Sequence, residues 1–328
     1  MRKRSRMRWL QVLIAAVIAI FLFLAIRRAW LELSRSPESW RWEDIRWGWM
    51  VPGLLWSMLA LVPLAIAWLQ ILRNFGTAVG WRSGAYAYCL GQLGKYVPGK
   101  AMVILLRVGQ LHRLGHPVRP AILSVFMETL TNFATGAVLG AMLIYSLSPP
   151  AWLFWLATLC MPIAIAALLP HPFRYLVAKI SRSRIGNMPE SIAHAIDGSM
   201  MLRTCIWSAL SWLCQGTALW CVMLALSPAE TLWSWRAWCV CITSACLGGV
   251  AGFVAMVPGG AGIREVSVMW IMTSIVSAPV ALLSAVVSRV LAMLAEVLMV
   301  ALTWLLDRSQ PTPVPAETPA SGPDIEAG

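Results

Sequence analysis

Long apolar runs, each close to 20 residues, are the feature that most restricts how this chain can fold. An α-helix of about 20 residues spans the ~30 Å hydrocarbon core of a bilayer. A backbone inside a bilayer must satisfy its own hydrogen bonds, and continuous apolar runs are typical of helices rather than of barrel strands. The hydrophobic fraction of 59% and the mean hydropathy of +0.72 also lie outside the range of soluble domains. The sequence therefore predicts an all-α, polytopic integral membrane protein.

The apolar runs predict eight crossings within one transmembrane domain over residues 1–306. We place these crossings at residues 9–26, 49–72, 118–147, 151–169, 203–226, 235–257, 263–280 and 281–306. The last two share one apolar run, which we divide at Ser277-Ala278-Pro279 because proline disfavours a helical residue before it. The Pro-, Ala- and acid-rich residues 307–328 are predicted to be a disordered cytoplasmic tail.

Two of the apolar stretches are interrupted by the same tripeptide, Val97-Pro98-Gly99 and Val257-Pro258-Gly259. A Pro-Gly break at membrane depth persists only where it lines a polar cavity or packs within protein. Matching interruptions in two halves of a transporter indicate its substrate site. The first break lies within residues 84–106, and neither arm of this segment reaches ~20 residues, so we predict that the segment is re-entrant.

A short similarity accompanies the two breaks. Cys89-Leu90-Gly91 precedes the first break and Cys246-Leu247-Gly248 precedes the second, although the spacings differ by three residues. Duplication of one half of the chain and chance recurrence in so biased a composition both explain this similarity. A two-halves internal repeat is therefore one possible organisation.

Basic residues predict the orientation of the helices, because Lys and Arg concentrate on the cytoplasmic side. Arginines such as Arg107 and Arg119 flank the re-entrant segment, and further basic residues lie in the 170–203 loop. The loops at 148–150 and 277–279 carry no charge. We predict a multi-pass protein of the cell inner membrane with both termini cytoplasmic. The basic residues that give the chain its net charge of +12 are expected to contact lipid headgroups and not nucleic acid.

Several ionisable residues fall inside the apolar stretches. Each costs about 2.5–3.5 kcal/mol at the bilayer centre, so such residues usually face a bundle interior or a cavity. Glu128 begins a stripe with Asn132, Gly136 and Gly140 at four-residue steps, and further charges occur at Arg264, Glu265, Arg289 and Glu296. We predict that Arg264 binds an anionic headgroup and that Glu265 holds Arg264 in place or relays protons. The alternative is that these charges form ion pairs between helices, with the glycines serving close packing.

Other chemistries find little support in the sequence. Residues Gly94 to Ala101 nearly spell a phosphate-binding loop, but Ala101 stands where a Mg²⁺-binding hydroxyl is needed. His112 and His116 have no third ligand nearby for zinc, and the eight cysteines lack CxxC spacing. No arrangement of Ser, His and acidic residues suggests catalysis. We therefore expect no cofactor, no metal and no catalytic residue.

Three motifs carry a resemblance to the flippase-like membrane region of lysylphosphatidylglycerol synthases, over roughly residues 10–306. They are Gly91-Gln92-Leu93-Gly94-Lys95-Tyr96-Val97-Pro98-Gly99, Pro258-Gly259-Gly260-Ala261-Gly262-Ile263-Arg264-Glu265 and Ser288-Arg289. The family often has Glu-Arg in the third crossing, where this chain has Glu128-Thr129. The 328 residues contain no counterpart of the soluble aminoacyl-transfer domain, so the resemblance implies lipid handling rather than lysine transfer.

Together these observations predict a flippase-like protein that moves an anionic phospholipid or polyprenyl-phosphate-linked headgroup between leaflets. Cations outnumber acids near the breaks, and free N–H groups at the start of half-helices also favour anions. The expected substrate site comprises Lys95, Pro98, Gly99, Lys100, Glu128, Pro258, Gly259, Gly260, Gly262, Arg264, Glu265, Arg289 and Glu296. Passive scrambling and proton coupling both fit. The alternatives are a subunit that presents lipid to a partner glycosyl- or aminoacyl-transferase, and an intramembrane lipid-modifying enzyme.

Overall fold

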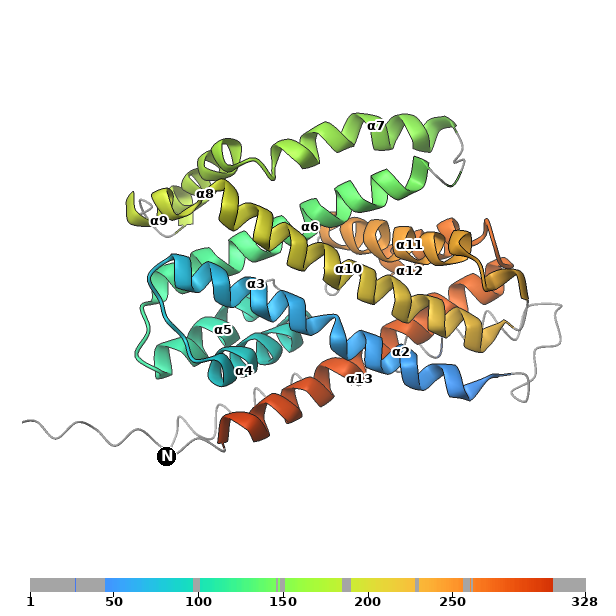
Figure 1. Ribbon diagram of the computed structural model, residues 1–328, viewed down its shortest axis with the longest axis horizontal. Coiled ribbons are helices and arrows are strands. Elements are labelled where there is room, and N and C mark those ends of the chain that lie inside the picture. The colour runs from blue at the N-terminus through green and yellow to red at the C-terminus, as the bar shows by residue number, and fades with distance from the viewer. Residues whose placement is uncertain are drawn as a thin grey trace, which may run out of the picture.

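The computed structural model describes residues 27, 45–96, 101–145, 147, 151–184, 190–227, 230–255, 260 and 262–308. Every element within these ranges is helical (Figure 1). Three predicted features lie outside the described residues. These are the first crossing at 9–26, both Val-Pro-Gly breaks, and the tail from residue 309 onward.

Five stretches of the described chain are long and apolar enough to cross a membrane, which confirms an all-α polytopic fold. They are the span Trp47–Asn74, built from η2 (Trp47–Trp49), α2 (Met50–Leu59) and α3 (Leu61–Asn74), and the helices α6 (Val118–Tyr145), α10 (Gly198–Leu226), α11 (Trp235–Val254) and α13 (Ala278–Arg308). Helix α10 is central, since it packs against α2, α3, α6, α11 and α13. These five coincide with predicted crossings, to within a few residues at each end.

The segment around the first break forms a hairpin of short helices. Helix α4 (Trp81–Gln92) continues into η3 (Leu93–Tyr96), and α5 (Ala101–Arg113) packs back against α4. A side chain added at Gly91 would meet Arg107, and one added at Gly94 would meet the backbone of Val103, so the two arms run antiparallel. Each arm is only ~20 Å long. Re-entry of this segment from one side of the membrane stays a prediction.

The segment around the second break also folds back, with α12 (Ile263–Met272) packed on α11, and α12 is shorter than the predicted crossing at 263–280. Helix α12 has 10 residues, or ~15 Å, and packs antiparallel to α11, with Gly248 beside Val268. The helix ends at Met272 because the hydroxyls of Thr273 and Ser274 donate to the carbonyls of Trp270 and Ile271, at 2.6 and 2.8 Å. Such side-chain bonds compete with helix continuation.

Helix α13 begins at Ala278, three residues before the predicted boundary, and places Pro279 in its first turn, where no N–H is needed. It continues through Asp307 and Arg308, which were assigned to the tail. Asp307 accepts a hydrogen bond of 2.6 Å from the Ser83 hydroxyl of α4, and the Arg308 guanidinium lies 3.9 Å from the centre of the Trp304 ring. These contacts explain why the last turn of the helix forms.

The stretch from 151 to 203 is more helical than predicted. Helix α7 (Ala151–Ala166) has 16 residues and packs against α6, and the basic loop contains α8 (Pro170–Arg184) and α9 (Glu190–Ala195). Helix α10 starts at Gly198 rather than at residue 203. The Asp197 carboxylate accepts a 2.7 Å hydrogen bond from the Met200 N–H and thereby caps the new helix.

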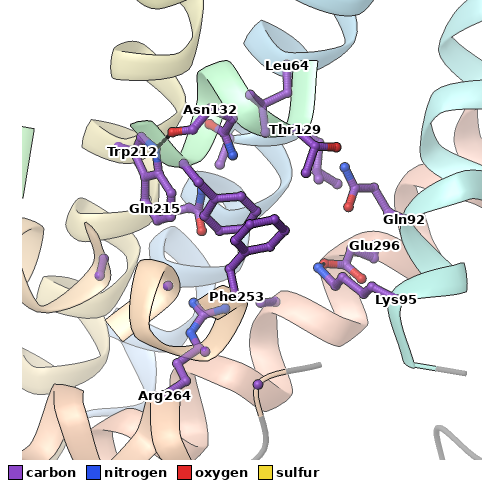
Figure 2. A pocket seen from close by; sticks show the side chains of 18 of the residues that line it. Leu64, Gln92, Lys95, Thr129, Asn132, Trp212, Gln215, Phe253, Arg264 and Glu296 are labelled. Atoms are coloured by element: carbon purple, nitrogen blue, oxygen red, sulfur yellow. Dashed lines mark hydrogen bonds and ion pairs between the residues drawn. The ribbon is translucent and has the colours of Figure 1, made fainter. Parts of the chain in front are cut away.

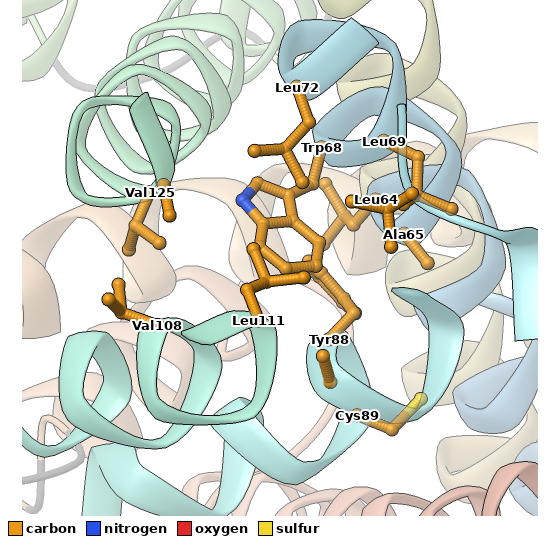
Figure 3. Packing of buried hydrophobic residues seen from close by; sticks show 13 residues of the cluster. Leu64, Ala65, Trp68, Leu69, Leu72, Tyr88, Cys89, Val108, Leu111 and Val125 are labelled. Carbon is orange, nitrogen blue, oxygen red and sulfur yellow. The ribbon is translucent and has the colours of Figure 1, made fainter. Parts of the chain in front are cut away.

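A buried apolar cluster fixes the α4–α5 hairpin to α3 and α6 (Figure 3). Trp68 of α3 is fully buried among Tyr88 of α4, Leu111 of α5 and Val125 of α6. The Trp68 indole N–H donates to the Ser124 hydroxyl at 3.0 Å, so its one polar atom is satisfied. This packing sets the position of α5 relative to α6, and with it the charged residues described below.

Candidate functional site

A cavity of about 600 Å³ lies between α2–α3, both hairpins, α6, α10 and α13 (Figure 2). Its described walls are mostly apolar and aromatic, but they contain seven charged side chains. These are Lys95, Arg107, Glu128, Arg264, Glu265, Arg289 and Glu296. Six of the seven, all except Arg107, were predicted as substrate-site residues. The fold brings these charges together from five separate elements, η3, α5, α6, α12 and α13.

One ion pair joins the tip of the first hairpin to the last helix. Lys95 of η3 forms a salt bridge and hydrogen bond with Glu296 of α13. The Lys95 ammonium also lies 5.3 Å from the centre of the Tyr96 ring, and the Arg289 guanidinium lies 6.0 Å from the same ring. The hairpin tip is therefore attached to α13 at the cavity.

Arg107 and Glu128 form a second ion pair. The distribution of basic residues had predicted Arg107 to be a charge flanking the re-entrant segment on the cytoplasmic side. Arg107 Nη1 lies 2.9 Å from Glu128 Oε2, and both side chains are buried. The Tyr88 hydroxyl donates to Glu128 Oε1 at 3.1 Å and accepts from Gln92 Nε2 at 2.7 Å. The Arg107 guanidinium also stacks 4.0 Å from the centre of the Tyr88 ring. Arg107 thus supplies the cation for Glu128, which is followed in this chain by Thr129 and not by arginine.

The third pair corrects the predicted contact between Glu265 and Arg264. Glu265 Oε1 lies 3.4 Å from Arg289 Nε of α13, and Glu265 Oε2 accepts a 2.6 Å hydrogen bond from the Gly262 N–H. Glu265 therefore caps α12 and pairs with Arg289 rather than with Arg264. Consecutive residues of a helix point about 100° apart, which separates the side chains of Arg264 and Glu265.

Glycine is required where the chain enters α12. Gly260 and Gly262 have φ values of +71° and +85°, a region that other L-residues adopt only under strain. Gly260 lies against the backbone of Gly252 in α11, so a side chain there would also collide with that helix. These two glycines set the position of Arg264 and Glu265 at the cavity.

Arg264 is the one charged residue of the described cavity wall that belongs to none of the three ion pairs. Each of the three carboxylates lining the cavity is paired with one cation. Within the described part of the chain, Arg264 has no hydrogen-bond partner and no carboxylate within 4.0 Å. Figure 2 shows its guanidinium directed into the cavity near Phe253. The described cavity wall thus carries one net positive charge, at Arg264.

The α6 stripe serves both the cavity and helix packing. Asn132 lines the cavity, and its backbone carbonyl accepts a 2.9 Å hydrogen bond from the Trp212 indole N–H. The Trp212 ring lies between Gly136 and Gly249, where an added Cβ would come within 2.7 and 2.5 Å of it. Gly140 packs against Leu247 instead of lining the cavity.

The remaining predicted residues fall into two groups. Gly260 lines the cavity and Gly262 lies beside it as the N-cap of α12. The others lie outside the described residues, namely Pro98, Gly99, Lys100, Pro258 and Gly259. Among the described residues, no group of three or more His, Cys, Asp or Glu side chains could hold a metal ion.

Comparison with known proteins assigns the chain to a family. No curated protein matches the sequence significantly. The family model described as "Lysylphosphatidylglycerol synthase TM region" matches residues 8–299. The match includes all seven charged residues of the cavity and both hairpins. The chain therefore belongs to the lysylphosphatidylglycerol synthase transmembrane-region family.

Proposed function

We propose that this protein translocates an anionic lipid headgroup between membrane leaflets, with Arg264 as the headgroup ligand. The observation that carries the proposal is the charge arrangement of the cavity, where three carboxylates are paired and Arg264 is left over. Family membership supports a lipid-related role in a membrane.

The chemistry of the leftover charge favours a phosphate-bearing ligand. A guanidinium with no counter-ion in a largely apolar cavity is costly, and a bound anion removes that cost. Arginine binds phosphate oxygens through two parallel N–H groups, which gives strong and oriented contacts. The stacked rings of Phe133 and Phe253, 4.0 Å apart, provide apolar surface beside Arg264 for the less polar part of a lipid.

The two hairpins suggest how a headgroup could pass. Lys95–Glu296 and Glu265–Arg289 join the first and second hairpins to α13 at the cavity, so exchange of either pair for a ligand contact would remove one of these attachments. We place the protein in the inner membrane with both termini cytoplasmic, and membrane lipids are its partners. Passive movement and proton coupling through the glutamates both fit this arrangement.

Reconstitution of the full chain in liposomes tests the proposal. Dithionite reduces and quenches the fluorophore of labelled phosphatidylglycerol in the outer leaflet only. Translocation therefore changes the fraction of the fluorescence that is protected from dithionite. We expect translocation by the wild type and at least a tenfold slower rate for Arg264→Gln. Arg119→Gln, which removes an exposed arginine at the start of α6, serves as the matched control and should leave the rate unchanged.

Other outcomes would support other functions. Lipid binding without translocation would contradict the proposal and favour a subunit that presents lipid to a partner transferase. A chemically altered lipid in the same liposomes would indicate an enzyme. Equal rates for Arg264→Gln and the wild type would remove Arg264 from the site.

A further inference from the structure

The cavity wall also contains an uncharged side chain, Asn132, with a buried polar atom that has no hydrogen bond among the described residues. Asn132 of α6 lines the cavity and is 9% exposed, and its side-chain Oδ1 is buried without a hydrogen bond. Its amide nitrogen likewise forms no hydrogen bond to any described residue. In Figure 2, Asn132 lies with Trp212 and Gln215 on one side of Phe253, whereas Arg264 lies on another. Buried amides are normally satisfied, so a partner for this one is expected.

The missing partner must donate a hydrogen bond to Oδ1, or accept one if the amide oxygen and nitrogen are exchanged. A carboxamide presents an acceptor oxygen and a donor nitrogen, and at Asn132 the acceptor Oδ1 is buried without a hydrogen bond. A phosphate oxygen can only accept and an ammonium can only donate, whereas a hydroxyl does both. A hydroxyl also suits the amide with its oxygen and nitrogen exchanged, because it can accept from the nitrogen as well as donate to the oxygen. The unsatisfied amide therefore matches a hydroxyl.

The charges of the cavity argue against an amine at the same place. An ammonium headgroup needs a carboxylate, and Glu128, Glu265 and Glu296 are each already paired with a cation. An added positive charge would also be repelled by Arg264. The cavity thus offers an anion site at Arg264 and an uncharged hydrogen-bonding site at Asn132, separated by the aromatic rings.

We infer that the ligand is a phosphodiester lipid whose headgroup carries a free hydroxyl, and that Asn132 is the residue that selects for this hydroxyl. This inference rests on the proposed function, because Arg264 is taken to hold the phosphate. A glycerol headgroup and a polyprenyl-phosphate-linked sugar share the required chemistry. The experiment below distinguishes these two sources.

The test compares lipids of equal charge that differ in their hydroxyls. Binding to the detergent-solubilised full chain is measured for phosphatidylglycerol and phosphatidylethanol, each with one negative charge. A second pair is a polyprenyl-phosphate-linked hexose and the ethyl ester of the same polyprenyl phosphate. We expect one hydroxylated lipid to bind about tenfold more tightly than its ethyl partner, the effect of one or two hydrogen bonds. The pair that shows the preference identifies the source.

Variants separate the two sites. Asn132→Leu should remove the preference for the hydroxyl while leaving binding of the ethyl lipids intact, and Arg264→Gln should weaken both members of a pair equally. Thr131→Val is the matched control, because Thr131 is another buried, unbonded polar residue of α6 that does not line the cavity. It should preserve the preference. Asn132→Ala gives the same expectation without added bulk if the leucine variant does not fold.

Four results would overturn the inference. Equal binding within both pairs would show that Asn132 does not bind a headgroup hydroxyl. A preference that persists in Asn132→Leu and Asn132→Ala would show the same. In either case, binding that still depends on Arg264 would leave the proposed function standing. Tighter binding of phosphatidylethanolamine than of phosphatidylglycerol would also contradict it. Loss of all Arg264 dependence would overturn the proposed function together with the inference.

Discussion

Arg107 and Glu128 form a buried ion pair, with Nη1 2.9 Å from Oε2, that joins the first hairpin to the long helix α6. Removal of one partner leaves an unpaired buried charge, which typically destabilises a protein by about 3–5 kcal/mol. We expect Arg107→Met and Glu128→Gln each to lower the unfolding temperature in detergent, and the double variant to recover most of it. Normal stability with lost translocation in the single variants would instead assign the pair a direct role in transport.

The Lys95–Glu296 contact should hold the tip of the first hairpin. Glu296→Gln removes the charge that attracts Lys95, so we expect faster amide hydrogen exchange at residues 93–96. Asp307→Ala removes a different hydrogen bond, which joins Ser83 of α4 to α13 at the other end of the hairpin arm. Exchange at 93–96 should stay at the wild-type rate in this control. Unchanged exchange in Glu296→Gln would show that packing alone holds the tip.

Glu265 has two roles, and two substitutions should separate them. Glutamine can still accept from the Gly262 N–H but loses the ion pair with Arg289, whereas alanine loses both contacts. We expect stability to fall in the order wild type, Glu265→Gln, Glu265→Ala, with about 1 kcal/mol between the two variants for the lost hydrogen bond. Thermal unfolding measures this order. Identical values for the two variants would exclude the capping role.

The Trp212 ring should make Gly249 intolerant of a side chain. The Cβ of Gly249→Ala would lie 2.5 Å from the ring, and overpacking of this kind costs about 1–3 kcal/mol. Gly109→Ala in α5 has no atom within 4 Å of the added Cβ, so this control should be neutral or stabilising by up to about 1 kcal/mol. A harmless Gly249→Ala would show that α10 and α11 can move apart.

The Asp197 cap should make the start of α10 sensitive to acid. Hydrogen bonds from the Met200 N–H and the Ser199 hydroxyl lower the pKa of Asp197 below its ordinary value. The capping contribution is therefore complete above the unfolded-state pKa and is lost as the pH falls through the lower, folded-state pKa. Asp197→Ala should remove about 1 kcal/mol at neutral pH, and Asp197→Asn should retain most of it. Unfolding measured from pH 7 to pH 3 checks this, and a pH response unchanged in Asp197→Asn would contradict it.

The sequence by itself determined the class of fold and most of the cavity's charges. Long apolar runs form helices in a bilayer because the backbone must satisfy its own hydrogen bonds there, whereas the starts of α10 and α13 were predicted several residues too late. Ionisable residues are costly in such runs, so Glu128, Arg264, Arg289 and Glu296 could be identified as cavity residues without coordinates. The interruptions at Pro98-Gly99 and Pro258-Gly259 lie outside the described residues, whereas Pro52-Gly53 lies within the first turn of α2, so the tripeptide alone does not fix a helix end.

The tertiary structure alone decided which charges pair. Lys95 and Glu296 are 201 residues apart, and their contact depends on how the first hairpin packs against α13. Arg107 has the same sequence context as a cytoplasmic flanking charge, and only the packing of α5 on Trp68 places it beside Glu128. Local sequence suggested a pair between Arg264 and Glu265, but α12 directs the two side chains apart. Ion pairs are short-range contacts between distant segments, so the residue left without one, Arg264, is defined only by the folded chain.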